Sequence, residues 1–165
     1  MNRPTLYDDD ILEWSEDQAA ALRRLAQTRH DLSNELDWEH VAEEIEDVGR
    51  SEFATVQSLT RQILIHLIKA LSVSDRQLIL MWRKEALAFR GDILDRASPS
   101  MPRRIDMDML WRRAMEQAEA DLAVYGQTVA TLLPKTCPVA IRDILAEGFD
   151  FIAAVETVRK QIEQK

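Results

Sequence analysis

Carboxylates cluster densely in the first third of the chain, and they are the residues best equipped for chemistry. The cluster consists of Glu39, Glu43, Glu44, Glu46 and Asp47. Asp37, His40 and Glu44 follow one another at steps of three and four residues, so on a helix they would share one face. Two carboxylates and an imidazole in this arrangement are suitable ligands for a metal ion.

A metal site in a helical bundle usually draws on facing helices, which combine carboxylates with Glu-x-x-His pairs. Asp37 and His40 form one carboxylate–histidine pair at this spacing. His30 and His66 each lack a carboxylate three residues earlier, so the chain offers no second pair. The alternative is a solvated face whose charges complement the positive end of the helix and pair with arginines. We adopt this second interpretation and predict no metal site.

His66 is a separate candidate, because it stands within the apolar run from Ile63 to Ile68. A buried imidazole needs partners for its ring nitrogens. A pH-responsive or general-base role is one interpretation, and a core histidine satisfied by a neighbour is the other. The acid cluster lies about 30 Å from His66 along a straight helix. We therefore predict that Trp82 or an acid of the third or fourth helix satisfies the His66 ring.

Trp82 and Arg83 would suit stacking and ion pairing with an anionic ligand or partner. The alternative is a core tryptophan next to an arginine that pairs with an acid. Cys137 has no adjacent base, so we interpret it as a small buried apolar residue and not as a nucleophile. No glycine-rich phosphate loop or Ser-x-x-Lys pattern is present. No catalytic residue and no cofactor is predicted.

The segment from Leu36 to Leu71 must position most of these side chains. It contains no proline and one glycine, Gly49, and it opens on the candidate cap Asp37. Its apolar residues recur at steps of three and four, which is a helical period. These residues are Trp38, Val41, Ala42, Ile45, Val48, Phe53, Val56, Leu59, Ile63, Leu67 and Ala70. We predict one helix that continues through Gly49.

Similar periodicity predicts the remaining helices. They cover residues 9–29, 75–97 and 107–133, with a short helix after Pro138 that ends at Gly148 and a last helix over 149–164. The candidate caps are Asp8 to Asp10, Ser74 with Asp75, and Asp106, while Pro99, Pro102 and Pro134 end helices. The expected fold is all-α: a helical bundle of four principal, mostly antiparallel helices with short C-terminal helices, in a single domain over residues 1–165.

Composition and charge narrow the class of protein further. Of the 165 residues, 46% are apolar and 30% charged, which is typical of a globular protein, and the single cysteine excludes an internal disulfide. The acidic start and the lack of a membrane-length apolar run predict a cytoplasmic protein with no membrane association. The net charge is −8; residues 1–54 hold 15 acids and 5 bases, whereas residues 61–104 hold 9 bases and 4 acids. We expect the basic segment to face the acidic one, within the fold or across a dimer, and expect no nucleic-acid binding.

The run Leu36 to Glu39, followed by Ala42 to Glu52, resembles the signature of the bacterial domain of unknown function 29 family. Further matching residues are Leu6-Tyr7-Asp8, Trp14, the 18–24 stretch, Leu64 to Lys69, Trp82-Arg83, Cys137-Pro138 and Ile144-Leu145. The resemblance covers residues 6–146. It departs from the family at His40, where an uncharged amide is usual, and residues 149–165 look like a private C-terminal helix. It implies an all-helical fold and no established activity.

These observations favour a non-enzymatic protein-interaction or adaptor module that forms a homodimer or binds a protein partner. The candidate contact residues are Glu43, Glu44, Asp47, His66, Trp82 and Arg83. The alternative is a small helical enzyme or a ligand- or metal-binding protein that uses a bundle-core pocket near His66 and Trp82.

Overall fold

The computed structural model describes residues 5–29, 31 and 35–163, and within these ranges it contains helices and connecting segments but no β-strand. This confirms the all-α prediction. The helices are α1 (Leu6–Asp9), α2 (Ile11–Thr28), α3 (Trp38–Ser72), α4 (Arg76–Arg96), the 3₁₀ turn η1 (Pro102–Arg104), α5 (Met107–Ala123), α6 (Ile141–Leu145) and α7 (Phe151–Glu163). None of the described helices is both long and apolar enough to cross a membrane.

The chain divides into two compact units. The N-terminal unit comprises Met1–Val56 and Arg96–Arg104, and the C-terminal unit comprises Gln57–Asp95 and Ile105–Lys165. Helix α3 runs without interruption through Gly49, as predicted, and contributes residues to both units. The assignment of residues 1–165 to a single domain stays a prediction.

Aspartates begin most of the longer helices, because a carboxylate satisfies backbone N–H groups that lack a partner in the first turn. In each case the aspartate accepts from the backbone N–H three residues later. The donor and acceptor residues are Glu13 and Asp10, His40 and Asp37, Leu78 and Asp75, Met109 and Asp106, and Ala153 and Asp150. The expected first helix over 9–29 is wrong in one respect. Asp10 interrupts it with φ −148°, so that a single-turn helix, α1, precedes α2.

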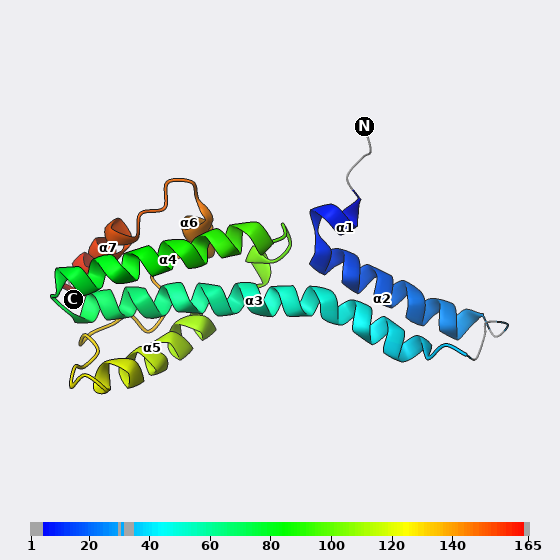
Figure 1. Ribbon diagram of the computed structural model, residues 1–165, viewed down its shortest axis with the longest axis horizontal. Helices are drawn as coiled ribbons and strands as arrows, with labels where there is room; N and C mark the ends of the chain where they lie inside the picture. Colours follow the sequence, from blue (N-terminus) through cyan, green and yellow to red (C-terminus); the bar gives the residue numbers. More distant parts are fainter. Residues whose placement is uncertain (1–4, 30, 32–34, 164–165) are drawn as a thin grey trace. The chain divides into compact units, whose positions relative to one another are not determined.

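In the N-terminal unit, α2 runs antiparallel to the first part of α3 (Figure 1). In the C-terminal unit, α4 runs back along the second part of α3, and α5, α6 and α7 complete the packing. All residues from Ile63 to Ile68 are buried, so this stretch of α3 is enclosed on every side. Trp111, Ile93, Phe151 and Val155 are among the other fully buried side chains of this unit.

The fourth expected helix, over 107–133, is wrong in its length. Helix α5 ends at Ala123 because Gly126 adopts φ +68°. The Gly126 N–H donates to Ala123 O and the Gln127 N–H donates to Leu122 O, both at 3.0 Å. This is the pattern of a glycine stop, in which the left-handed conformation closes the last helical turn. The next element, α6, covers only Ile141–Leu145 and is shorter than predicted.

Candidate functional site

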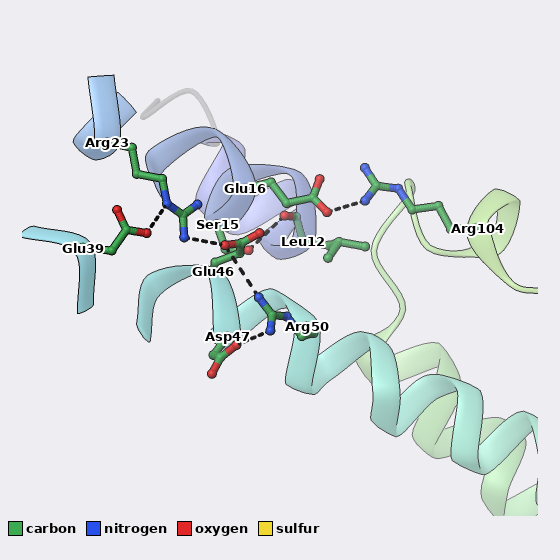
Figure 2. Close-up of polar contacts among 9 residues, drawn as sticks. All are labelled: Leu12, Ser15, Glu16, Arg23, Glu39, Glu46, Asp47, Arg50 and Arg104. Carbon is green, nitrogen blue, oxygen red and sulfur yellow. Dashed lines mark hydrogen bonds and ion pairs between the residues drawn. The ribbon is translucent and has the colours of Figure 1, made fainter. Parts of the chain in front are cut away.

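Helices α2 and α3 approach so closely at Gly49 that no side chain fits there. A Cβ atom at Gly49 would lie 2.2 Å from Ser15 Oγ, 2.8 Å from Leu12 Cα and 3.1 Å from Ile11 O. The Ser15 hydroxyl is buried and donates to Leu12 O at 3.0 Å (Figure 2). Glycine at this position is therefore a packing requirement of the helix pair.

Two arginines pair with the acid cluster of α3: Arg23 comes from α2, and Arg50 comes from α3 (Figure 2). Arg23 Nε lies 2.9 Å from Glu39 Oε1, and its Nη2 lies 3.0 Å from Glu46 Oε2. Arg50 reaches back to Glu46 at 3.6 Å and to Asp47 at 3.1 Å. Hydrogen bonds to Glu39 and Glu46 raise the pKa of Arg23. One part of the cluster thus serves to join two helices, as the pairing interpretation expects.

Asp10 is a buried carboxylate that ties the start of α2 to the segment after α4. It accepts bonds from the Ser100 N–H at 2.7 Å, the Ser100 hydroxyl at 2.9 Å and the Glu13 N–H at 3.1 Å. Burial alone would raise the pKa of Asp10, but the hydrogen bonds from Glu13 and Ser100 hold it below its usual value. The ionised carboxylate is therefore the form that the fold stabilises.

Two bases of the segment 61–104 pair with acids of the N-terminal half. Arg104 Nη1 lies 2.6 Å from Glu16 Oε1 (Figure 2), and Arg96 Nη1 lies 3.1 Å from Glu52 Oε2. These two pairs, both within the N-terminal unit, confirm for Arg96 and Arg104 the prediction that the basic segment faces the acidic one.

The apolar period of α3 placed Val41 and Val48 with the core residues, and here the expected packing is wrong. Val41 is 37% exposed and Val48 is 47% exposed. Ala42 and Gly49, one position further along, are the buried residues instead. The reason is the close contact at Gly49, which turns the small residues of α3 toward α2 and the valines away from it.

The exposed side of α3 therefore combines valines with carboxylates. Val41, Glu44 and Val48 follow one another at steps of three and four residues, so they lie along one stripe of the helix. Glu43 and Asp47 are also exposed and lie beside this stripe. We call these five residues the acidic face.

Asp37, His40 and Glu44 do not assemble into a metal site. His40 Nδ1 lies 2.5 Å from Asp37 Oδ2, and this bond, with the charges of Asp37 and nearby acids, raises the pKa of His40. Glu44 is exposed and does not join them. In the described part of the chain, no three His, Cys, Asp or Glu side chains are grouped so that they could hold a metal ion.

His66 is buried in the C-terminal unit and is satisfied on one side by an acid of α4, as predicted. Its Nε2 lies 3.1 Å from Glu85 Oε2, and its ring stacks on Phe89 with centroids 5.7 Å apart. Its Nδ1 is buried and has no hydrogen-bond partner among the described residues. Burial lowers the pKa of His66; Lys69 acts in the same direction, whereas Glu85 and Asp121 oppose it. The ring is therefore neutral at pH 7, and its Nε2 faces the Glu85 carboxylate.

A pocket of about 310 Å³ opens close to His66. The residues that line it are Lys69, Leu78, Met81, Trp82, Asp121, Leu122, Tyr125 and Gln127. Lys69 forms an ion pair with Asp121, which also accepts a bond from Gln117 at 2.8 Å. Trp82 is buried, as its core interpretation expects, but it also forms part of the pocket wall.

Arg83 lies outside this pocket's lining and belongs to an exposed stripe on α4. Arg76, Leu80, Arg83 and Lys84 recur at helical spacing and are all exposed. No ion pair of Arg83 with an acid is found in the ranges that the structure describes, so its expected pairing is not seen there. We call these four residues the basic face.

Cys137 is held in a way that suits a structural role. Its thiol lies 3.2 Å from Val139 O and its backbone N–H donates to Asp108 at 2.7 Å. Burial raises the pKa of the Cys137 thiol to about 11, so very little reactive thiolate exists near neutral pH.

The protein is of the all-α class, and its acid-rich run lies on α3. There α3 packs against α2 at Gly49, and Arg23 of α2 bridges the two helices. A family model, "Domain of unknown function DUF29", matches residues 6–150, and the chain belongs to this family. The chain is also similar to an α-helical protein of unknown function from Rhodospirillum rubrum, known from a crystal structure. The two are 37% identical over 94% of this chain and 99% of the other, with a TM-score of 0.86. No significant match is found among curated proteins.

Sequence reasoning missed the Lys69–Asp121 pair and the role of Glu85. One signal was present: Lys69 lies three residues after His66, on a helix stretch that is otherwise apolar. A lysine in that position is at least partly enclosed and needs an acid from another helix. Which acid it meets depends on how α4 and α5 pack on α3, and that is a tertiary property.

Proposed function

We infer that this protein is a non-enzymatic interaction module of the cytoplasm that self-associates as a homodimer through its acidic and basic faces. The observation that carries this proposal is the acidic face of α3. Two valines lie exposed among three carboxylates, on a helix that Gly49 and Arg23 hold tightly against α2. Apolar anchors on a rigid element, surrounded by charges, are typical of protein-binding surfaces.

The basic face of α4 has the matching chemistry. Leu80 is 48% exposed and is flanked by Arg83 and Lys84. Pairing it with the acidic face of a second copy would bury leucine against valine and place guanidinium and ammonium groups against carboxylates. Complementary charge of this kind sets the partner and the register and increases the association rate.

The test is the mass of the protein in solution, measured by light scattering at several protein and salt concentrations. We expect a dimer that dissociates as salt screens the charges. Glu44→Lys and Arg83→Glu should each give a monomer, because each places like charges opposite one another. Glu147→Lys makes the same charge change as Glu44→Lys at another exposed site and should leave the dimer intact.

Mixing the two single variants makes the experiment sharper. If each copy supplies both faces, the altered acidic face of the Glu44→Lys chain meets the altered basic face of the Arg83→Glu chain. Opposite charges then face each other again at that contact, while the second contact is native. The mixture should therefore dimerise although neither variant does alone. A wild-type monomer at every concentration, or a mixture that stays monomeric, contradicts the proposed dimer.

A further inference from the structure

The pocket beside Trp82 holds a cation and an anion side by side, and four of its other six lining residues are apolar. Lys69 and Asp121 form an ion pair, and the Lys69 side chain is only 14% exposed. Leu78, Met81 and Trp82 supply apolar wall on the α4 side. Enclosing a charged pair is costly, so this arrangement is not what packing alone would favour.

The Lys69–Asp121 pair has hydrogen-bonding capacity left over. An ammonium group has three N–H donors, and Asp121 is the one described partner of Lys69. The Asp121 carboxylate accepts from Lys69 and from Gln117 and retains further lone pairs. The Asp121 side chain is 33% exposed, so a molecule in the pocket can reach its outer oxygen.

We propose that this pocket binds a small zwitterion with an apolar side chain, that is, an apolar α-amino acid. Its carboxylate bonds to Lys69 and its ammonium to Asp121, which closes a ring of four alternating charges. Its side chain lies against Leu78, Met81 and Trp82. The pocket, about 310 Å³, falls at the small end of the range for ligand sites, which suits a molecule of this size.

The balance of charge excludes simpler ligands. A plain carboxylic acid would pair with Lys69 but would face the charge of Asp121, and a plain amine would meet the reverse problem. Only a ligand with both charges satisfies both groups. His66 is neutral at pH 7 and therefore adds no charge to this balance.

L-leucine is the probe, and its binding is followed by NMR through the backbone amides of the full chain. We expect saturable shifts at Lys69, Met81, Asp121 and Tyr125 with a Kd of about 1 mM or lower. 4-Methylpentanoic acid lacks the ammonium and 3-methylbutylamine lacks the carboxylate. Each should bind at least about tenfold more weakly, because one charged hydrogen bond is lost.

Substitutions at and near the pocket distinguish a loss of ligand binding from a loss of folding. Met81→Trp adds bulk to a residue of the pocket lining that is 46% exposed and should abolish binding without unfolding the protein. Leu94→Trp makes the same kind of change at an equally exposed residue of α4, outside both the lining and the basic face, and should leave the Kd unchanged. Asp121→Asn should remove the preference for leucine over 4-methylpentanoic acid.

Two outcomes would overturn the proposal. One is the absence of saturable shifts with L-leucine at about 20-fold the expected Kd. The other is equal binding of leucine and both analogues, which would make the pocket an apolar cleft without charge recognition. Neither outcome affects the dimer, whose acidic and basic faces share no residue with the pocket lining.

Discussion

Replacing Gly49 with alanine tests whether the contact between α2 and α3 depends on the missing side chain. The added methyl carbon would lie 2.2 Å from Ser15 Oγ and 2.8 Å from Leu12 Cα, both closer than nonbonded atoms approach. The hydroxyl can rotate away, but the Cα atom belongs to the backbone of α2 and cannot. The helix pair must therefore separate locally.

The size of the effect follows from two opposing contributions. Alanine is a better helix former than glycine by about 1 kcal/mol. Forcing a methyl group into a closed contact costs about 1 to 3 kcal/mol, and more where backbone has to move. Because the backbone of α2 has to move, we take the upper end of this cost, and we expect Gly49→Ala to destabilise the protein by about 2 kcal/mol net.

Gly91 provides a matched control, because it lies inside α4 and a Cβ there would meet nothing within 4 Å. Gly91→Ala should raise stability by about 0.5 to 1 kcal/mol, since only helix propensity changes. Urea denaturation monitored by circular dichroism gives both values. Hydrogen exchange locates the effect: amides of α2 should exchange faster in Gly49→Ala, while those of α5 should be unaffected.

A second substitution distinguishes the two contacts. Ser15→Ala in the Gly49→Ala background removes the hydroxyl but leaves Leu12 Cα in place, so it should restore only part of the stability. If Gly49→Ala is as stable as the wild type, α2 does not lie against α3 as described. Full rescue by Ser15→Ala would show that the backbone contact is looser than 2.8 Å implies.

Three further predictions concern single buried groups. Asp10→Ala should cost about 3 kcal/mol in urea denaturation, because the Ser100 N–H is left buried without an acceptor, and Asp10→Asn should cost less. His66→Leu should be close to neutral at pH 7, since its partner Glu85 is 46% exposed and can bond to water. The pKa of His66 is lowered in the fold, so the wild type should lose stability as pH falls below about 6.5, and the difference from His66→Leu should grow over that range; a difference independent of pH would contradict it. The Cys137 thiol should react with iodoacetamide at about pH 8 roughly a hundredfold more slowly in the native protein than in urea, because its pKa is raised from 9.0 to about 11, and equal rates would show that it is not enclosed.

The sequence alone determined the elements whose signals are local. The aspartate caps at Asp37, Asp75 and Asp106 and the helical period between them predicted α3 and α4 almost to the residue. The same helical period in the other long segments predicted the all-α class. Local signals failed where one residue had two possible roles. Gly126 is tolerated within a helix or ends it, and the sequence pattern does not decide between the two; in the structure it has φ +68° and ends α5.

Tertiary structure decided which side chains meet. Periodicity places Val41, Ala42, Val48 and Gly49 on neighbouring positions of one helix, but only the contact with α2 makes the small residues buried and the valines exposed. A buried histidine signals that some partner exists, and the sequence limited that partner to a few candidates. The packing of α4 on α3 made Glu85 the partner, because contacts between helices depend on their axial register, which no short-range pattern encodes.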